Sequence, residues 1–195
     1  MDASPSLPRS PELMSRDDTA LLVVDVQQRL LPLISGHRRL VWNVRRLLDG
    51  ARLLTIPVAA TEQYPQGLGS TTPELASYLG TIPAKLAFSA GECGAVFRTW
   101  RDQGRWKIAV CGIETHVCVA QTVLDLLAEG FRVFVPIDAV GARHALDHET
   151  ALRRLDASGA TLTTTEAALF EWCERAGTPE FKGISQLVRE SPPED

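Results

Sequence analysis

Apolar positions divide the first part of the chain into short continuous apolar runs and one longer segment with helical spacing. The run Ala20–Val26 is short, rich in β-branched residues and not alternating, which is typical of a strand buried on both faces of a parallel sheet. From His37 to Thr55 apolar residues recur at helical spacing, which predicts an amphipathic helix. Residues Ile56–Ala60 follow as a second strand, with Pro57 at its entry, where a missing N–H is tolerated.

The same alternation continues along the rest of the chain. The Pro and Gly content of Thr61–Gly69 predicts a loop, and Thr72 is predicted to cap a helix that begins at Pro73. Lys85 lies in a short stretch of its own. Further strands are predicted at residues 107–113, 131–136 and 160–163. Further helices are predicted at about residues 94–103, 115–129, 146–158, 165–175 and 181–189.

Strands that alternate with helices favour a parallel sheet covered on both faces. The sequence therefore predicts an α/β fold of three layers, α-β-α, built on a doubly wound, mainly parallel sheet of six strands, Rossmann-like in architecture. In such a sheet ligands bind at the carboxyl ends of the strands. Residues 19–190 are predicted to form one domain, after a mobile lead-in at residues 1–18 and before an acidic, Pro-rich tail at residues 191–195.

The composition narrows the class of partner. A net charge of −4 argues against nucleic acid or an anionic membrane, because both attract basic patches. No apolar run approaches the roughly 20 residues that cross a bilayer, and residues 1–18 lack the apolar core of a signal peptide. The four cysteines show no C-x-x-C spacing, which fits reduced thiols in a cytoplasmic protein better than a disulfide framework.

Asp25 ends the first predicted strand inside an otherwise apolar run. A carboxylate is costly to bury unless it is paired or hydrogen-bonded, so Asp25 needs a partner. The alternative interpretation is an N-cap for a helix that starts at Val26. Lys85 stands in a mostly apolar stretch, and its default interpretation is a surface side chain with its ammonium in water. Placed between Asp25 and Cys118, however, a cation would keep both in their charged forms.

Cys118 follows a predicted strand and lies in the first turn of a predicted helix. A helix N-terminus carries unpaired N–H groups and a partial positive charge, which stabilise a thiolate and an oxyanion. The alternative is a buried structural thiol, an interpretation that fits Cys93, Cys111 and Cys173 better.

Neither a metal nor a cofactor is predicted from the remaining motifs. Gly67-Leu68-Gly69 does not continue as a dinucleotide-binding motif. His144 and His148 are four residues apart but open a polar helix, so we expect them on a solvated face. No metal-ligand spacing is offered by the four histidines, His37, His116, His144 and His148.

Taken in order, these segments resemble the isochorismatase-like hydrolases over Thr19–Val188. The matching motifs are Leu21–Gln27, Lys85–Ser89, Gly112–Val119 and Asp138-Ala139. The resemblance implies a catalytic triad of Asp25, Lys85 and Cys118. It also implies a cis peptide between Ile113 and Glu114. It further implies a small-molecule substrate and a homo-oligomer, for which an exposed apolar face on the C-terminal helices would be suitable.

Two departures from the family narrow the expected activity. Members that hydrolyse the vinyl ether of isochorismate commonly lack the nucleophilic cysteine, which this chain keeps as Cys118. Nicotinamidases carry a metal-binding Asp-x-His after the second strand, where this chain reads Thr61-Glu62-Gln63. The run Glu62–Gly69 instead resembles the isochorismatase-domain subgroup.

The expected reaction is hydrolysis of a C–N bond in a small amide or carbamoyl compound through a Cys118 thioester. Asp25 would transfer protons, Lys85 would orient Asp25, and the backbone N–H groups of Glu114 and Cys118 would hold the oxyanion. Predicted substrate contacts follow strand ends or flank Lys85: Gln27, Glu62, Gln63, Tyr64 and Phe88. The alternatives are a non-catalytic binding or scaffold protein and an isochorismate-type vinyl ether hydrolase. A nucleotide-dependent oxidoreductase is disfavoured, because this chain lacks the phosphate-binding glycines of that class.

Overall fold

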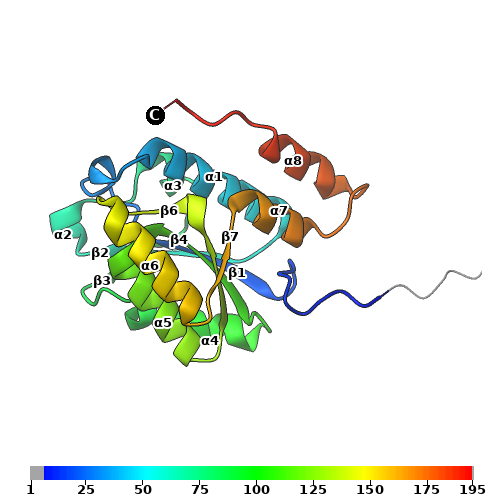
Figure 1. Ribbon diagram of the computed structural model, residues 1–195, viewed down its shortest axis with the longest axis horizontal. Coiled ribbons are helices and arrows are strands. Elements are labelled where there is room, and N and C mark those ends of the chain that lie inside the picture. Colours follow the sequence, from blue (N-terminus) through cyan, green and yellow to red (C-terminus); the bar gives the residue numbers. More distant parts are fainter. Residues whose placement is uncertain (1–6, 195) are drawn as a thin grey trace, which may run out of the picture.

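A parallel sheet forms the centre of the protein in a computed structural model that describes residues 7–194. Its strand order is β3-β2-β1-β4-β5-β7, and β6 pairs with β4 (Figure 1). The strands are β1 (Thr19–Val24), β2 (Val58–Gln63), β3 (Ala84–Lys85), β4 (Lys107–Ile113), β5 (Arg132–Pro136), β6 (Val140–Gly141) and β7 (Thr161–Thr163). The sheet therefore has seven strands where the sequence predicted six.

Helices cover both faces of the sheet, which confirms the predicted three-layer α/β fold. Helices α1, α3, α7 and α8 lie on one face, and α4, α5 and α6 lie on the other (Figure 1). Each face has its own apolar core, because side chains of β1 and β4 alternate between the two. The helices are α1 (His37–Leu54), α2 (Pro65–Leu68), α3 (Pro73–Ala76), α4 (Ala95–Asp102), α5 (Ala120–Ala128), α6 (Ala145–Ala157), α7 (Thr165–Cys173) and α8 (Pro179–Val188).

Two predicted boundaries are corrected near the carboxyl edge of the sheet. Strand β2 begins at Val58 and runs to Gln63, so the start of the predicted loop is strand, held by pairing of Glu62 and Gln63 with β3. The predicted helix 115–129 is divided into one π-helical turn, Thr115–Val119, and α5. We call Thr115–Val119 the Cys118 turn.

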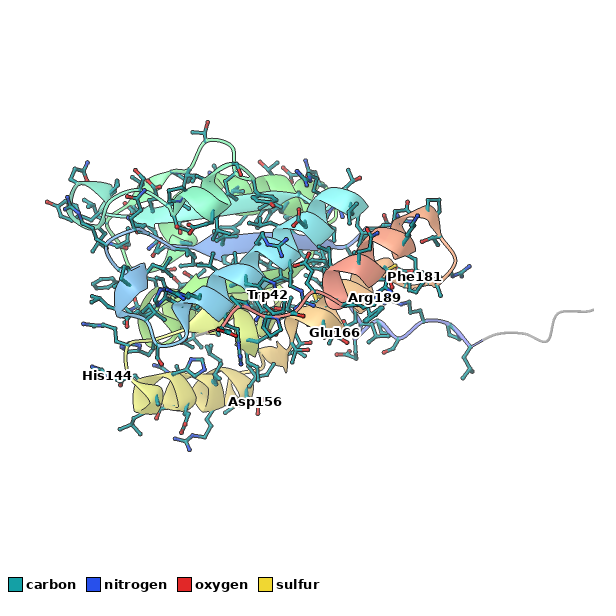
Figure 2. All side chains as sticks on the ribbon, turned by 90° about the horizontal axis from the view of Figure 1, so that it is seen from above. Trp42, His144, Asp156, Glu166, Phe181 and Arg189 are labelled. Carbon is teal, nitrogen blue, oxygen red and sulfur yellow. The ribbon has the colours of Figure 1, made fainter. Side chains whose placement is uncertain are left out.

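The end of the described chain lies along α1. Helix α8 packs across α1, and Figure 2 shows the segment after Arg189 passing close to Trp42. The Trp42 indole N–H donates to the Glu190 carboxylate at 3.2 Å. The predicted tail therefore begins against α1, and its last residue, Asp195, lies outside the described residues.

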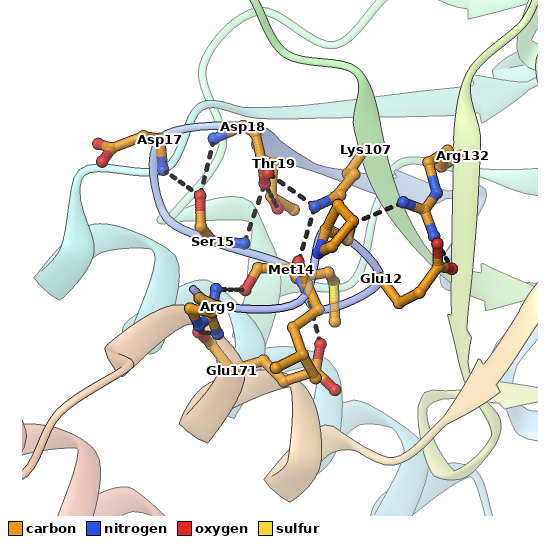
Figure 3. A network of polar contacts seen from close by, with 12 residues as sticks. Arg9, Glu12, Met14, Ser15, Asp17, Asp18, Thr19, Lys107, Arg132 and Glu171 are labelled. Atoms are coloured by element: carbon orange, nitrogen blue, oxygen red, sulfur yellow. Dashed lines mark hydrogen bonds and ion pairs between the residues drawn. The ribbon is translucent and has the colours of Figure 1, made fainter. Parts of the chain in front are cut away.

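The lead-in predicted to be mobile is docked on the domain over much of its length. Met14 is fully buried, and its N–H donates to the Glu171 carboxylate at 2.8 Å. The Lys107 ammonium donates to the Leu13 carbonyl at 2.6 Å and to Asp18 at 2.7 Å (Figure 3). Cations at the starts of the strands thus hold this segment along the amino-terminal edge of the sheet.

Residues 9–18 therefore contact the domain, whereas the sequence predicted a lead-in without fixed contacts; residues 1–6 lie outside the described residues. Arg132 at the start of β5 donates to the Pro11 carbonyl and to Glu12, which extends the same network (Figure 3). Within residues 7–194, no helix combines the length and apolar character that a membrane span requires.

A close contact between β1 and β4 brings the chemistry-bearing segments together. Gly112 has a φ of +118°, and a Cβ there would lie 2.0 Å from the Val24 carbonyl oxygen. Only glycine fits this approach. Val24 is in register with both Gly112 and Thr61, so Asp25, the end of β2 and the Cys118 turn share the carboxyl edge of the sheet.

Candidate active site

Asp25 follows β1 directly and is completely buried. Its backbone is left-handed, with a φ of +53°, a conformation that non-glycine residues adopt mainly at functional sites and tight turns. One carboxylate oxygen accepts from the Lys85 ammonium at 2.7 Å, and the other accepts from the Thr61 hydroxyl at 2.8 Å. The helix-cap interpretation is wrong, because the next helical turn begins at Leu31.

Lys85 ends β3 with its side chain entirely buried, so the surface interpretation is wrong. Its ammonium donates to Asp25 at 2.7 Å, to the Gln63 side-chain oxygen at 2.7 Å and to the Phe88 carbonyl at 2.8 Å. These acceptors match the donor capacity of an ammonium group. The ammonium is therefore fixed in position and directed at Asp25.

Three predicted substrate contacts make hydrogen bonds that connect the segments of the site. Gln27 donates to the Gln63 carbonyl at 3.0 Å and accepts from the Gln63 N–H at 2.8 Å. The Gln63 amide bridges Lys85 and the Leu86 carbonyl. Glu62 accepts from the backbone N–H and hydroxyl of Thr71. The side-chain amides of Gln27 and Gln63 and one oxygen of Glu62 are therefore bonded within the protein, and contact of these residues with a substrate stays a prediction.

Tyr64 and Phe88 are the two predicted substrate contacts that face outward. Each side chain is about half exposed, at 51% for Tyr64 and 52% for Phe88. The Tyr64 N–H donates to the Lys85 carbonyl at 3.0 Å, which places the Tyr64 backbone beside the lysine segment. Both residues remain candidates for contact with a ligand.

Cys118 is buried, and its thiol interacts with the same ion pair. Burial raises the pKa of the Cys118 thiol to about 12; the negative charge of Asp25 adds to the rise, and the positive charge of Lys85 opposes it. The sequence had predicted a stabilised thiolate. Desolvation and Asp25 outweigh the helix start and Lys85, so the resting thiol is protonated with Asp25 as its neighbouring base.

The other cysteines differ in their distance from this chemistry. Burial raises the pKa of Cys111 well above its usual range, and Cys173 is buried in α7. Both fit the predicted structural role. Cys93 is only half-buried. Burial raises the pKa of its thiol, the charge of Lys85 acts to lower it, and the charge of Asp25 acts to raise it. It lines, with Thr61, a cavity of about 330 Å³ beside β2, a proximity that the sequence did not reveal.

The segment before Cys118 is anchored by α6. The Ile113–Glu114 peptide is cis, at the position implied by the family resemblance. The buried Glu114 carboxylate accepts from the Arg143 backbone N–H at 3.0 Å and from its guanidinium Nε at 3.1 Å. Thr115 Oγ1 lies 2.9 Å from His148 Nδ1.

These contacts correct one expectation and add another residue. His148 is in contact with Thr115, so only His144 of the predicted solvated pair is exposed. Burial lowers the pKa of His148. Arg143 was missed, because an arginine before a helix gives no sign of its partner in sequence. Residues 7–194 contain no cluster of three or more His, Cys, Asp or Glu suited to a metal ion.

The sequence of this chain is similar to those of known proteins. A family model described as the isochorismatase domain matches residues 19–167. Isochorismatase domain-containing protein 2 from Bos taurus is 41% identical over 175 residues, which cover 89% of this chain and 84% of the relative.

Solved structures of similar fold cover almost the whole chain. MAR1 ribonuclease from Caenorhabditis elegans matches with a TM-score of 0.86 and 35% identity over 93% of this chain and 95% of its own. YcaC from Pseudomonas aeruginosa, solved with hexane-2,5-diol and covalent acrylamide, gives 0.82 and 28% over 92% and 93%. YcaC from Escherichia coli, an octameric hydrolase of unknown specificity, gives 0.84 and 26% over 93% and 91%. The chain belongs to the isochorismatase family.

Proposed function

We propose that this protein is a cysteine hydrolase that cleaves the C–N bond of a small amide or carbamoyl compound through a Cys118 thioester. The observation that carries the proposal is the buried Asp25 carboxylate, which is held by Lys85 at 2.7 Å and whose charge acts on the buried Cys118 thiol at the same edge of the sheet. A base held against a thiol in a water-poor site is the arrangement that nucleophilic catalysis needs.

In the first half of the reaction, Asp25 takes the thiol proton as the Cys118 sulfur attacks the substrate carbonyl carbon. The carbonyl oxygen becomes an oxyanion, for which the backbone N–H groups of Glu114 and Cys118 are the proposed donors. Asp25 then gives its proton to the nitrogen, the C–N bond breaks and the amine leaves. The acyl group remains on sulfur.

In the second half, Asp25 takes a proton from water, and the oxygen attacks the thioester carbon. The C–S bond breaks, the acid leaves, and the proton held by Asp25 returns to the Cys118 sulfur. Lys85 keeps Asp25 in one orientation throughout, since its ammonium is fixed by hydrogen bonds to Asp25, Gln63 and Phe88. Tyr64 and Phe88 are the proposed contacts for the substrate at the surface.

Two relatives support this choice of chemistry. The E. coli protein is described as a hydrolase, and the P. aeruginosa protein carries a covalent acrylamide. Acrylamide is an alkylating agent for thiols that also contains an amide group. By analogy, we expect small amides that carry an electrophile to modify Cys118 with help from Asp25.

The test is a panel of small amides and carbamoyl compounds, with isochorismate and RNA as substrates of the competing activities. We expect hydrolysis of an amide by the wild-type chain and by Cys173→Ala, and a loss of at least about a thousandfold in Cys118→Ala. The acyl intermediate should appear on the Cys118 peptide by mass spectrometry. Turnover retained by Cys118→Ala would overturn the proposal, as would activity on isochorismate or RNA alone.

We further propose that the protein is a homo-oligomer in a reducing compartment such as the cytosol. The E. coli relative is described as octameric. Leu86 and Phe88 are exposed by 70% and 52%, on the segment next to Lys85. Apolar side chains of this size on a surface favour association. The four cysteines are free, as reduced thiols are in the cytosol.

A further inference from the structure

Arg143, just before α6, is hydrogen-bonded to Glu114, the residue that precedes the Cys118 turn. Strand β6 pairs with Gly112 and Ile113, and Arg143 follows it by two residues. The Arg143 backbone N–H and guanidinium both donate to the Glu114 carboxylate, at 3.0 and 3.1 Å. In Figure 2, the neighbouring His144 marks this end of α6. The contact therefore joins two segments that are already tied together by the sheet.

Glu114 needs this partner because its side chain is only 7% exposed. A buried carboxylate is stable as an anion only when it is paired or well hydrogen-bonded. The charge also acts on Cys118, which faces Asp25, Lys85 and Glu114. Two of these groups are anions, and both oppose formation of a thiolate. Neutralising one of them from outside the site favours the nucleophile.

We propose that Arg143 is a positioning residue for the hydrolysis, acting through Glu114 to compensate an anion beside the nucleophile and to fix the Glu114 backbone. This inference rests on the proposed function of Cys118. Arg143 touches neither Asp25 nor Lys85 in the described contacts, so its effect passes through Glu114. Arginine suits the role because its planar guanidinium and its backbone N–H can donate to the same carboxylate.

The expected effect is moderate because the Arg143 side chain is 47% exposed. Solvent screens a charge at such a position. Loss of Arg143 should raise the pKa of Cys118 by about half a unit to one unit, which slows thiolate-dependent reactions by about three- to tenfold.

The test measures alkylation of Cys118 by iodoacetamide over a pH series, with peptide mapping to separate the four cysteines. We expect Arg143→Ala to slow alkylation of Cys118 by about three- to tenfold and to move its pH profile upward. Arg143→Lys should recover part of the rate, since it keeps the charge without the fork. Arg154→Ala, which removes an exposed arginine of α6, is the matched control and should behave as wild type.

A double-mutant cycle separates this role from a general loss of structure. In a Glu114→Gln background the charge is absent, so Arg143→Ala should no longer move the pH profile. An unchanged profile in Arg143→Ala, or a shift of equal size in the Glu114→Gln background, would overturn the inference. If Arg143→Ala does not fold, Arg143→Gln, which keeps a hydrogen-bond donor without charge, is compared in its place.

The two proposals fail in different ways. If hydrolysis requires Cys118 and the alkylation profile ignores Arg143, only the role of Arg143 is lost. If the profile follows Arg143 but Cys118→Ala still hydrolyses the substrate, the electrostatic role of Arg143 stands and the proposed function is wrong.

Discussion

Lys85 and Asp25 form an ion pair with no exposed side-chain surface. Removing two charges from water is costly, and a well-packed apolar pair at such a place is often as stable or more stable. The pair is therefore poorly explained by stability. Its geometry is better explained by function, since Lys85 is held by its bonds to Gln63 and Phe88, and Asp25 is held in one orientation by Lys85 and the Thr61 hydroxyl.

Lys85→Met should destabilise the protein strongly, because it leaves the Asp25 charge buried without its partner. The expected loss is about 3–5 kcal/mol in the free energy of unfolding, together with loss of hydrolysis. The double variant Asp25→Asn/Lys85→Met should recover most of the stability and none of the activity. Urea unfolding and the amide assay measure both quantities. A single variant as stable as wild type would show that Asp25 is not isolated from water.

At this scale the sequence reveals residue types but not their partners. Their positions in the sequence, together with the resemblance to a family, indicate a triad of Asp25, Lys85 and Cys118. The contact of Thr61 with Asp25 depends on the register of β2 against β1, which no local pattern determines. The protonated state of Cys118 depends on burial, which outweighs the favourable helix start that is visible in the sequence.

Elements with a strong period are predictable, and elements held by neighbours are not. The long helix α1 and the apolar strands β1 and β4 lie close to their predicted positions. The two-residue strand β6 forms only because β4 is beside it. The polar composition of the segment before β1 predicts a mobile chain. Its Leu13 carbonyl and Asp18 carboxylate nevertheless accept hydrogen bonds from the Lys107 ammonium at the start of β4. Such tertiary contacts leave no periodic signal.

The contact between Lys107 and Asp18 should make the docked lead-in sensitive to acid. Burial acts to raise the pKa of Asp18, but hydrogen bonds from Lys107 and the Ser15 N–H outweigh it, so the pKa is lower than the usual 3.8. A lowered folded-state pKa adds stability above the unfolded value, and this stability is lost as the pH falls through the folded value. We expect Asp18→Asn to be less stable than wild type at neutral pH, with the difference shrinking below about pH 3.8.

Denaturant unfolding at several pH values tests this expectation. The matched control is Asp17→Asn, which removes the same charge from an exposed neighbour and should leave the unfolding free energy nearly unchanged. A constant difference between Asp18→Asn and wild type down to acid pH would contradict the linkage.

The whole molecule places its buried site beside an exposed apolar surface. Asp25 and Lys85 are closed off from solvent, while Tyr64, Leu86 and Phe88 on the adjoining segments remain exposed. Self-association had been expected through the C-terminal helices. Helix α8 instead directs Ile184 and Leu187 into the core, so the surface next to Lys85 is the better candidate.

A second copy of this chain is the proposed cover for that surface. Light scattering after size exclusion should give a mass several times that of one chain. Leu86→Glu should shift the protein toward smaller species, because a charge in an apolar contact is costly to desolvate. Leu33→Glu, which changes another exposed leucine outside this segment, is the control. The same oligomer in Leu86→Glu would place the interface elsewhere, and a monomer at micromolar concentration in wild type would contradict self-association itself.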